Sequence, residues 1–189
     1  MSSVVPPAAW SGARRVPVSN AVLGTGVYVA TAIMFFGGLV SAYLVLRAGS
    51  PAWPPAGQPR LPVAITGANT LVLLASGLCV WWARRAAQLQ SRTRALHAAI
   101  VLGFVFVGVQ GIEWIRLVGY GLRASGGSYG ATFYTIVGAH AVHALGGIAM
   151  LVVTSRFVRA GRGDLPAALL YWGFVVLLWP VLYALVYLV

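Results

Sequence analysis

Two histidines three residues apart, His140 and His143, have the residue type and spacing that could bind a metal. Positions i and i+3 share a helix face, so both imidazoles could reach a haem iron or a copper ion. A redox site needs further ligands, and the only other histidine, His97, is predicted near the start of a different helix. The single cysteine, Cys79, excludes a site built on a cysteine pair. We therefore expect the two histidines to hydrogen-bond to a neighbouring helix and to hold no metal.

A second polar group surrounds Glu113, one of only two acidic residues in the chain. Gln110 lies three residues before it and Arg116 three residues after it, so the three side chains can share one helix face. An ionisable side chain in hydrocarbon costs roughly 2.5–3.5 kcal/mol on insertion scales, so each one needs a partner or a function. Two interpretations stay open: an interfacial carboxylate paired with arginine, or a Gln/Glu face that contacts another helix or subunit.

The composition of the chain indicates an integral membrane protein. Hydrophobic residues make up 60% of its 189 residues and charged residues 8%, whereas roughly 25% charged is usual in soluble domains. All 13 basic residues are arginines, and the formal net charge is +11. In a chain of apolar segments, basic residues in loops set the orientation in the membrane. We therefore expect no nucleic-acid partner.

The apolar segments predict an all-α membrane protein with five transmembrane helices, taking roughly 20 residues for each crossing. The first 20 residues contain no apolar core, so they are expected to be a cytoplasmic tail and not a cleaved signal peptide. The rest of the chain, 21–189, forms one transmembrane domain. The predicted helices are 21–46, 62–83, 95–120, 131–156 and 166–189.

The arginines predict the orientation of these helices. Nine lie on one side, in the tail and in the second and fourth loops, and four lie on the other. The positive-inside rule then places the N-terminus in the cytoplasm and the C-terminus outside. The nine are Arg14, Arg15, Arg84, Arg85, Arg92, Arg94, Arg156, Arg159 and Arg162, and the four are Arg47, Arg60, Arg116 and Arg123.

Small residues recur at a spacing of four in two predicted helices. This spacing lets helix backbones approach closely, where van der Waals packing drives association. We therefore expect Gly37 and Gly38 to contact another helix. The pairs are Gly37 with Ser41 and Gly38 with Ala42 in the first helix, and Ala99 with Gly103 in the third.

Six motifs, taken in order, resemble subunit III of the haem-copper respiratory oxidases. In the first half, "YVATAIMFFGGLVSAYLVLR" (28–47, ending at Arg47) resembles the family's Glu-x-Met-Phe-Phe helix, "WPPAG" (53–57) its Trp-Pro-Pro loop, and "PVAITGANTLVLLASG" (62–77, with Asn69) its Asn-Thr-x-x-Leu-Leu helix. In the second half, Gln110 and Glu113 match a Gln-x-x-Glu pair, "FYTIVGAHAVHALGG" (133–147) matches Gly-x-His-x-x-His, and "YWGFVVLLWPVLY" (171–183) resembles Tyr-Trp-His-Phe-Val-Asp. The resemblance covers 21–189 and fits the five-helix bacterial form.

The resemblance implies an accessory subunit of a proton-translocating terminal oxidase, which reduces oxygen to water with electrons from cytochrome c or quinol. Such a subunit holds no redox centre of its own. It packs beside the catalytic subunit I and with subunit II in the bacterial cytoplasmic membrane, where the partners carry haem and copper. It binds phospholipid and supports turnover and proton uptake. The residues expected at helix, lipid or subunit contacts are His140, His143, Gln110, Glu113, Arg47, Asn69, Gly37 and Gly38.

Three positions depart from the family pattern, and each departure removes a polar group. Ala32 stands where the family has the glutamate before Met-Phe-Phe, Gly173 replaces the histidine of the last helix, and Val176 replaces its aspartate. In the family the glutamate is buried and linked to proton uptake, so that role does not carry over to Ala32.

Two alternatives remain at this stage. One is the related subunit-III-like component of nitric oxide reductases, against which the "WPPAG" loop favours the oxidase. The other is a small stand-alone transporter, which would need broken helices or charges inside the membrane. Pro180 interrupts the last predicted helix, but no inverted repeat is visible in the sequence.

Overall fold

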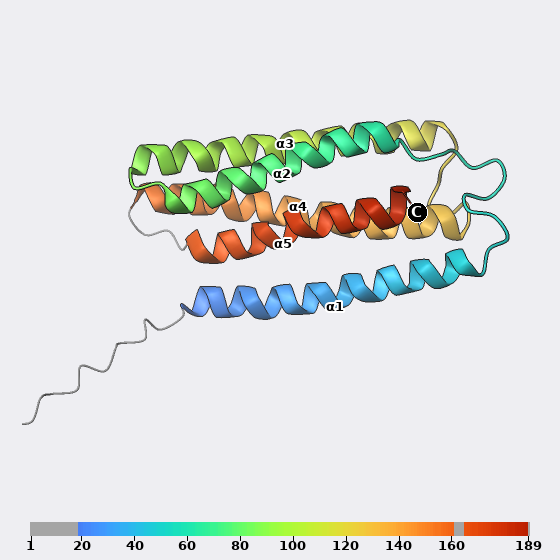
Figure 1. Ribbon diagram of the computed structural model, residues 1–189, viewed down its shortest axis with the longest axis horizontal. Helices are drawn as coiled ribbons and strands as arrows, with labels where there is room; N and C mark the ends of the chain where they lie inside the picture. Colours follow the sequence, from blue (N-terminus) through green and yellow to red (C-terminus); the bar gives the residue numbers. More distant parts are fainter. Residues whose placement is uncertain (1–18, 161–164, 189) are drawn as a thin grey trace, which may run out of the picture.

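The computed structural model describes residues 19–160 and 165–188, which form five long helices (Figure 1). All five are long and apolar enough to cross a membrane, and these residues contain no strand. The prediction of an all-α protein with five spanning helices is confirmed, while the predicted tail, 1–20, lies outside the described residues except for its last two. The helices are α1 (Asn20–Ala48), α2 (Val63–Arg85), α3 (Leu89–Gly119), α4 (Ser128–Arg159) and α5 (Leu165–Tyr183), and α5 continues into a π-helical turn, η1 (Ala184–Leu188).

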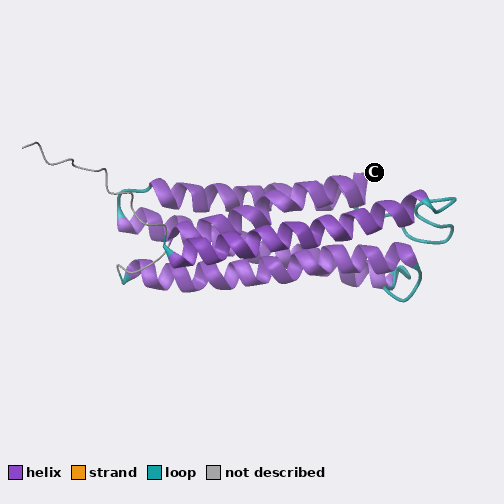
Figure 2. Ribbon diagram, turned by 90° about the horizontal axis from the view of Figure 1, so that it is seen from below, coloured by secondary structure: helices purple, strands orange, loops and turns teal. Residues whose placement is uncertain are grey.

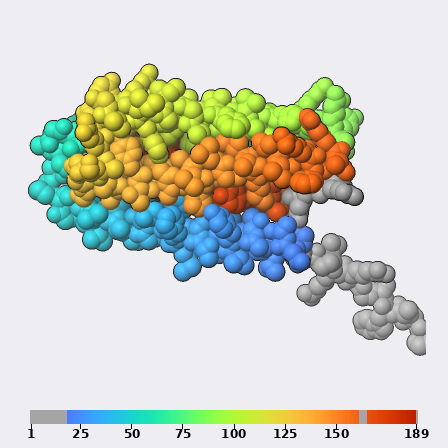
Figure 3. All heavy atoms as spheres, turned by 180° about the vertical axis from the view of Figure 1, so that it is seen from behind, coloured from blue at the N-terminus to red at the C-terminus, as the bar shows by residue number. Residues whose placement is uncertain are grey.

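The helices run up and down along one common direction (Figure 2). The start of α1, the α2–α3 connection and the start of α5 lie at one end of the bundle, and the α1–α2 and α3–α4 connections lie at the other (Figure 1). Helix α5 packs against α1, α2 and α4, and α2 packs against α3. Viewed from behind, α4 lies between α1 and α3 (Figure 3).

The largest difference from the predicted ranges is the start of α3, which begins at Leu89 and not at 95. Residues 89–94 include polar and arginine side chains, so hydropathy does not assign them to the span. They remain helical because backbone hydrogen bonds from i to i−4 do not require apolar side chains. The helix therefore extends past its apolar segment.

Glycine allows the sharp turns between α3 and α4. Gly121 has φ 93° and Gly127 has φ 117°, conformations that residues with a Cβ rarely adopt. After Gly121 the amide of Leu122 donates to the carbonyl of Leu117 at 2.9 Å, the longer hydrogen bond of a Schellman motif. These turns return the chain into the bundle.

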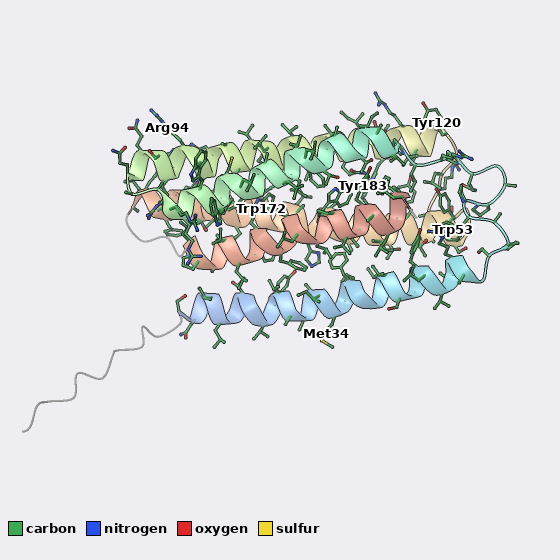
Figure 4. All side chains as sticks on the ribbon, viewed as in Figure 1. Met34, Trp53, Arg94, Tyr120, Trp172 and Tyr183 are labelled. Carbon is green, nitrogen blue, oxygen red and sulfur yellow. The ribbon has the colours of Figure 1, made fainter. Side chains whose placement is uncertain are left out.

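The buried core consists of aromatic and aliphatic side chains contributed mainly by α2 to α5. The largest fully buried side chains include Trp172 and Trp179, both on α5. Helix α1 is peripheral, since its buried residues are Ala32, Phe36 and Tyr43. Met34 of α1, labelled in Figure 4, points away from the other helices and is 77% exposed.

Candidate functional site

His140 lies at the centre of the bundle, where α4 faces three other helices. Its side chain is buried and contacts aromatic rings from each of them. The imidazole centroid is 4.9 Å from Trp179 on α5, 6.1 Å from Phe106 on α3 and 6.4 Å from Phe36 on α1. His140 is therefore a packing residue that joins four helices through ring contacts.

His143, one turn later, faces α1. Its ring packs edge-on against Phe36 with centroids 5.1 Å apart, and its Nδ1 lies 2.8 Å from the carbonyl oxygen of Ala139 in its own helix. The hydroxyl of Tyr171 on α5 donates to the backbone carbonyl of His143 at 3.3 Å.

The prediction that both imidazoles hydrogen-bond to a neighbouring helix is wrong in its detail. Neither nitrogen of His140 has a hydrogen-bond partner among the described residues, and Nδ1 of His143 pairs within its own helix. The reason is that the side chains packed most closely against the two imidazoles are aromatic rings, among them Phe36, Phe106 and Trp179. Both histidines do contact other helices, through ring packing.

The histidines do not form part of a larger cluster of possible metal ligands. Across residues 19–160 and 165–188, no group of three or more His, Cys, Asp and Glu side chains converges. His97 lies elsewhere, near the start of α3, where its Nε2 is 3.0 Å from the guanidinium of Arg159 at the end of α4.

Polar residues on one face of α2 tie it to α3. The side-chain amide of Asn69 donates to the carbonyl of Phe106 at 3.0 Å, and Ser76 Oγ donates to the carbonyl of Ala99 at 2.8 Å.

Ala99 belongs to the small-residue pair predicted in α3. Its partner, Gly103, is buried, and a Cβ there would lie 3.1 Å from Ile148 and Trp172. The close approach expected of that pair is made inside this chain.

The same face of α2 receives two buried tryptophans from α5. Trp172 Nε1 donates to Ser76 Oγ at 3.1 Å, and Trp179 Nε1 donates to Thr70 Oγ1 at 2.9 Å. The sequence prediction selected Asn69 and missed Thr70, Ser76 and both tryptophans. The signal was present: Thr66, Asn69, Thr70 and Ser76 recur with helical periodicity on one face of an otherwise apolar helix.

Gln110 and Glu113 are both buried on α3 and have separate partners. Glu113 forms a 2.6 Å ion pair with Arg116, whereas the amide nitrogen of Gln110 donates to the hydroxyl of Tyr187 in η1 at 3.0 Å. The arginine pair of the first interpretation is present, and of the Gln/Glu face the glutamine contacts another element, while a contact with another subunit stays a prediction. The tyrosine of η1 was not predicted.

The Trp-Pro-Pro loop packs over one end of the bundle, where Figure 4 labels Trp53. Trp53 Nε1 donates to the hydroxyl of Tyr43 on α1 at 3.2 Å, and its ring stands edge-on to Tyr129 of α4 at 5.1 Å. This contact joins the start of α4 to the end of α1. Arg47 lies half-buried in the last turn of α1 next to this loop, and its role stays a prediction.

Gly37 and Gly38 lie on the exposed face of α1. A Cβ at either position would have nothing within 4 Å, and Ser41 Oγ donates back to the carbonyl of Gly37 at 2.8 Å. The predicted helix contact is therefore not made within the described part of this chain. A contact with lipid or another subunit remains a prediction.

Two apolar grooves flank the first half of α5. The α1/α5 groove has a volume of about 700 Å³ and the α2/α5 groove about 550 Å³, and Gly173 lines both of them. The α1/α5 groove is lined by Val22, Val29, Ile33, Arg84, Pro166, Leu169, Leu170, Gly173, Phe174, Leu177 and Leu178. The α2/α5 groove is lined by Leu74, Gly77, Leu78, Val80, Trp81, Leu169, Trp172, Gly173, Val176 and Leu177.

Two of the three departures from the family pattern, Gly173 and Val176, line these grooves. Gly173 has no atom within 4 Å of a potential Cβ, so its missing side chain leaves open space. Val176 packs against Gly77 of α2, and Ala32 lies on the buried face of α1. Gly173 and Val176 therefore contribute no polar group to the apolar surface around α5.

The helices and their buried contacts define a polytopic α-helical membrane protein of five spans. The family model for cytochrome c oxidase subunit III matches residues 2–189. The chain belongs to the cytochrome c oxidase subunit III family, as the six sequence motifs indicated, and the nitric oxide reductase alternative is not favoured. It is thus a subunit of a terminal oxidase complex.

Individual relatives support the same assignment. Cytochrome c oxidase subunit 3 of Thermostichus vulcanus is 31% identical over 176 residues, covering 88% of this chain and 86% of that protein. The subunit 3 of Pongo pygmaeus is 31% identical over 200 residues, covering 97% of this chain and 76% of that protein. The match to Struthio camelus is 34% identical over 145 residues and covers 71% of this chain, but it spans only about half (54%) of that relative.

Proposed function

We propose that this chain is the accessory subunit III of a terminal oxidase in the aerobic respiratory chain of a bacterial cytoplasmic membrane. It packs beside the catalytic subunit I and with subunit II, which carry the haem and copper groups, and it supports proton uptake and sustained turnover. The observation that carries this proposal is the family match from residue 2 to residue 189. The complex reduces oxygen to water with electrons from cytochrome c or quinol.

The distribution of arginines supports an orientation with the N-terminus in the cytoplasm. Among the described residues, six arginines lie toward the end of the bundle where α1 and α5 begin, and four lie toward the opposite end. Arg14, Arg15 and Arg162 of the predicted cytoplasmic set fall outside the described residues. The excess of positive charge on the first side fits the positive-inside rule.

The exposed face of α1 supports a contact with another subunit or with lipid. It carries large apolar side chains, and Gly37 and Gly38 lie near mid-helix with nothing within 4 Å of a Cβ. Small residues at a spacing of four are suited to close helix packing in a membrane. We place the predicted contact of these two glycines on this face.

The proposal predicts that the tagged chain, isolated from native membranes in mild detergent, will carry haem and copper in fixed ratio to itself. The reason is that the partner subunits hold these groups. The measurement combines an absorption spectrum with metal analysis of the purified complex. An unrelated membrane protein with the same tag serves as the control and should carry neither group; a colourless chain that migrates alone would contradict the proposal.

We propose that the α1/α5 groove binds phospholipid. The groove follows α5 from Pro166 to Leu178, a rise of about 18 Å at 1.5 Å per residue. This length is comparable with one leaflet of a hydrocarbon core that is about 30 Å thick. Arg84 lies at the end of α2 where it lines the groove, in a position to pair with a lipid phosphate.

Filling the groove is expected to release lipid. The substitution Gly173→Phe places a ring in the open space beside α5, and we expect the purified complex to retain markedly less phospholipid. Lipid phosphorus assay and mass spectrometry provide the measurement. Gly108→Phe is the matched control, because Gly108 also has nothing within 4 Å of a Cβ but lines neither groove; equal lipid content in both variants would contradict the assignment.

A further inference from the structure

A pocket with a mixed lining lies at the end of the bundle where the α1–α2 connection meets the start of α4 and η1, beside the Trp53 label in Figure 4. Its volume is about 290 Å³, and its walls include Trp53 and Arg60 from the connection, Tyr129 from α4 and Tyr187 from η1. The lining of the α1/α5 and α2/α5 grooves is mostly apolar, whereas polar and apolar surface contribute about equally here. The pocket is therefore suited to a ligand with both a polar and an apolar part.

Arg60 supplies a positive charge at this pocket that no side chain of the chain's described part balances. It is exposed, and it makes no ion pair or hydrogen bond within residues 19–160 and 165–188. Glu113 is the only acidic residue in those ranges, and its carboxylate is taken by Arg116 at 2.6 Å. A guanidinium binds phosphate through two parallel N–H donors, so the pocket favours an anionic ligand with such a group.

The segment that carries Arg60 is held in place on both sides. Before it, the carbonyl of Pro59 accepts a hydrogen bond from the hydroxyl of Tyr129 on α4 at 3.4 Å. After it, the carbonyl of Val63 accepts one from the hydroxyl of Tyr183 on α5 at 3.0 Å. A site whose backbone is already fixed loses less conformational freedom when a ligand binds. The arginine is therefore presented from an ordered frame.

The apolar part of the pocket continues onto the sides of the bundle. Val63 is the first residue of α2 and Leu188 the last of η1; both line the pocket, and they are 39% and 57% exposed. Both stand at the ends of membrane-spanning helices, where hydrocarbon gives way to head groups. Tryptophan and tyrosine rings, which also line this pocket, are enriched at that level of a membrane. A phosphate beside Arg60 would thus have an acyl chain beside these two aliphatic side chains.

We propose that this pocket binds an anionic phospholipid such as phosphatidylglycerol, with its phosphate on Arg60 and an acyl chain past Val63 and Leu188. No acidic side chain lines the pocket to pair with the ammonium of a zwitterionic lipid. The site shares no lining residue with the α1/α5 groove and lies at the opposite end of the bundle from Arg84. It requires a membrane-spanning chain but not the oxidase assignment or the lipid proposed for that groove.

The test is photo-crosslinking of the purified complex in lipid nanodiscs with phosphatidylglycerol that carries a diazirine on its head group. Mass spectrometry of the digested chain should find label on residues 53–63 and 186–188, several-fold less in Arg60→Gln. Arg123→Gln is the matched control, because Arg123 is an exposed arginine at the same end that does not line the pocket, and it should label as the wild type does. Equal labelling of the wild type and Arg60→Gln would overturn the proposal.

Further arms separate the lipid from other anions. Phosphatidylcholine with the same diazirine should label several-fold less, and Arg60→Lys, which keeps the charge, should retain most of the labelling by phosphatidylglycerol. Excess glycerol 3-phosphate should leave that labelling unchanged; displacement by it would show a site for free phosphate and overturn the lipid assignment. An Arg60→Gln complex that loses a partner subunit while its labelling stays unchanged would show that Arg60 pairs with an acidic residue of the partner, which also overturns the proposal.

Discussion

Replacing Trp179 with alanine is expected to destabilise the folded chain by about 3–5 kcal/mol, the cost of emptying a large buried aromatic site. Its side chain is 0% exposed and packs edge-on against Phe106 with centroids 5.0 Å apart. It also stacks near His140, and its Nε1 donates to Thr70 on α2. One side chain of α5 therefore joins α2, α3 and α4. Denaturant unfolding of the full-length chain in detergent, followed by helical circular dichroism, measures the change.

Two further variants separate the components of this effect. Trp179→Phe keeps one aromatic ring, removes the N–H donor and leaves a small cavity, so it should cost more than the roughly 0.5–1.5 kcal/mol of one hydrogen bond but less than Trp179→Ala. Trp82→Ala is the control for loss of an exposed indole, because Trp82 is 70% exposed, and it should change stability by less than about 0.5 kcal/mol. Equal losses in Trp179→Ala and Trp82→Ala would show that Trp179 does not anchor the core.

The five spanning helices could be predicted because the membrane restricts the choice. A segment of about 20 apolar residues in hydrocarbon must satisfy its backbone hydrogen bonds internally, and a helix does so. Hydropathy gives less information about where a helix ends in water. The first turns of α3, from Leu89, are polar and lie outside any apolar window, yet they continue the helix.

The partners of individual side chains could not be predicted in the same way. The spacing of His140 and His143 correctly indicates a shared face, but it does not identify the residues on the opposing helices. Those residues are the aromatic Phe36 and Trp179. Spacing along one helix does not identify them because they come from distant parts of the sequence. A hydrogen-bonded role was therefore predicted where ring packing is found.

Spacing motifs had a similar limit. The Ala99–Gly103 pair packs inside the bundle, whereas the equivalent pairs that begin at Gly37 and Gly38 face outward. The spacing is the same in both helices, and the difference arises from the helix rotation that tertiary packing selects. Sequence spacing therefore marks surfaces suited to close approach without showing which helix or subunit covers them.

The departures at Gly173 and Val176 gain a physical meaning from the structure, whereas the one at Ala32 has no structural explanation. From the sequence they indicate only that three polar groups are lost. In the folded chain Gly173 lines both grooves beside α5, and Val176 contacts Gly77 at the α2/α5 groove. Polar groups at 173 and 176, which the resemblance leads us to expect, would make that surface hydrophilic; the apolar residues found there suit the phospholipid that we propose for the groove beside α5.

Adding one methyl group at Gly147 is expected to destabilise the chain by up to about 2 kcal/mol, since overpacking a filled core costs about 1–3 kcal/mol and the better helix propensity of alanine returns roughly 1 kcal/mol. A Cβ at this position of α4 would lie 2.6 Å from Cε3 of Trp172 and 3.2 Å from Cε1 of Tyr171. The indole of Trp172 cannot move away freely, because it is buried and hydrogen-bonded to Ser76. The clash should outweigh the gain of roughly 1 kcal/mol in helix propensity from glycine to alanine. Denaturant unfolding of Gly147→Ala in detergent measures the net loss.

The matched control, Gly108→Ala, should have the opposite sign. Gly108 is an exposed position within α3 with nothing within 4 Å of a Cβ, so only the propensity gain of up to about 1 kcal/mol applies. A second check is the double variant Gly147→Ala with Trp172→Phe. If the clash with the indole causes the loss, the smaller ring relieves it, and the double variant will be more stable than the sum of the single effects predicts. Strict additivity would assign the loss to a different contact of Gly147.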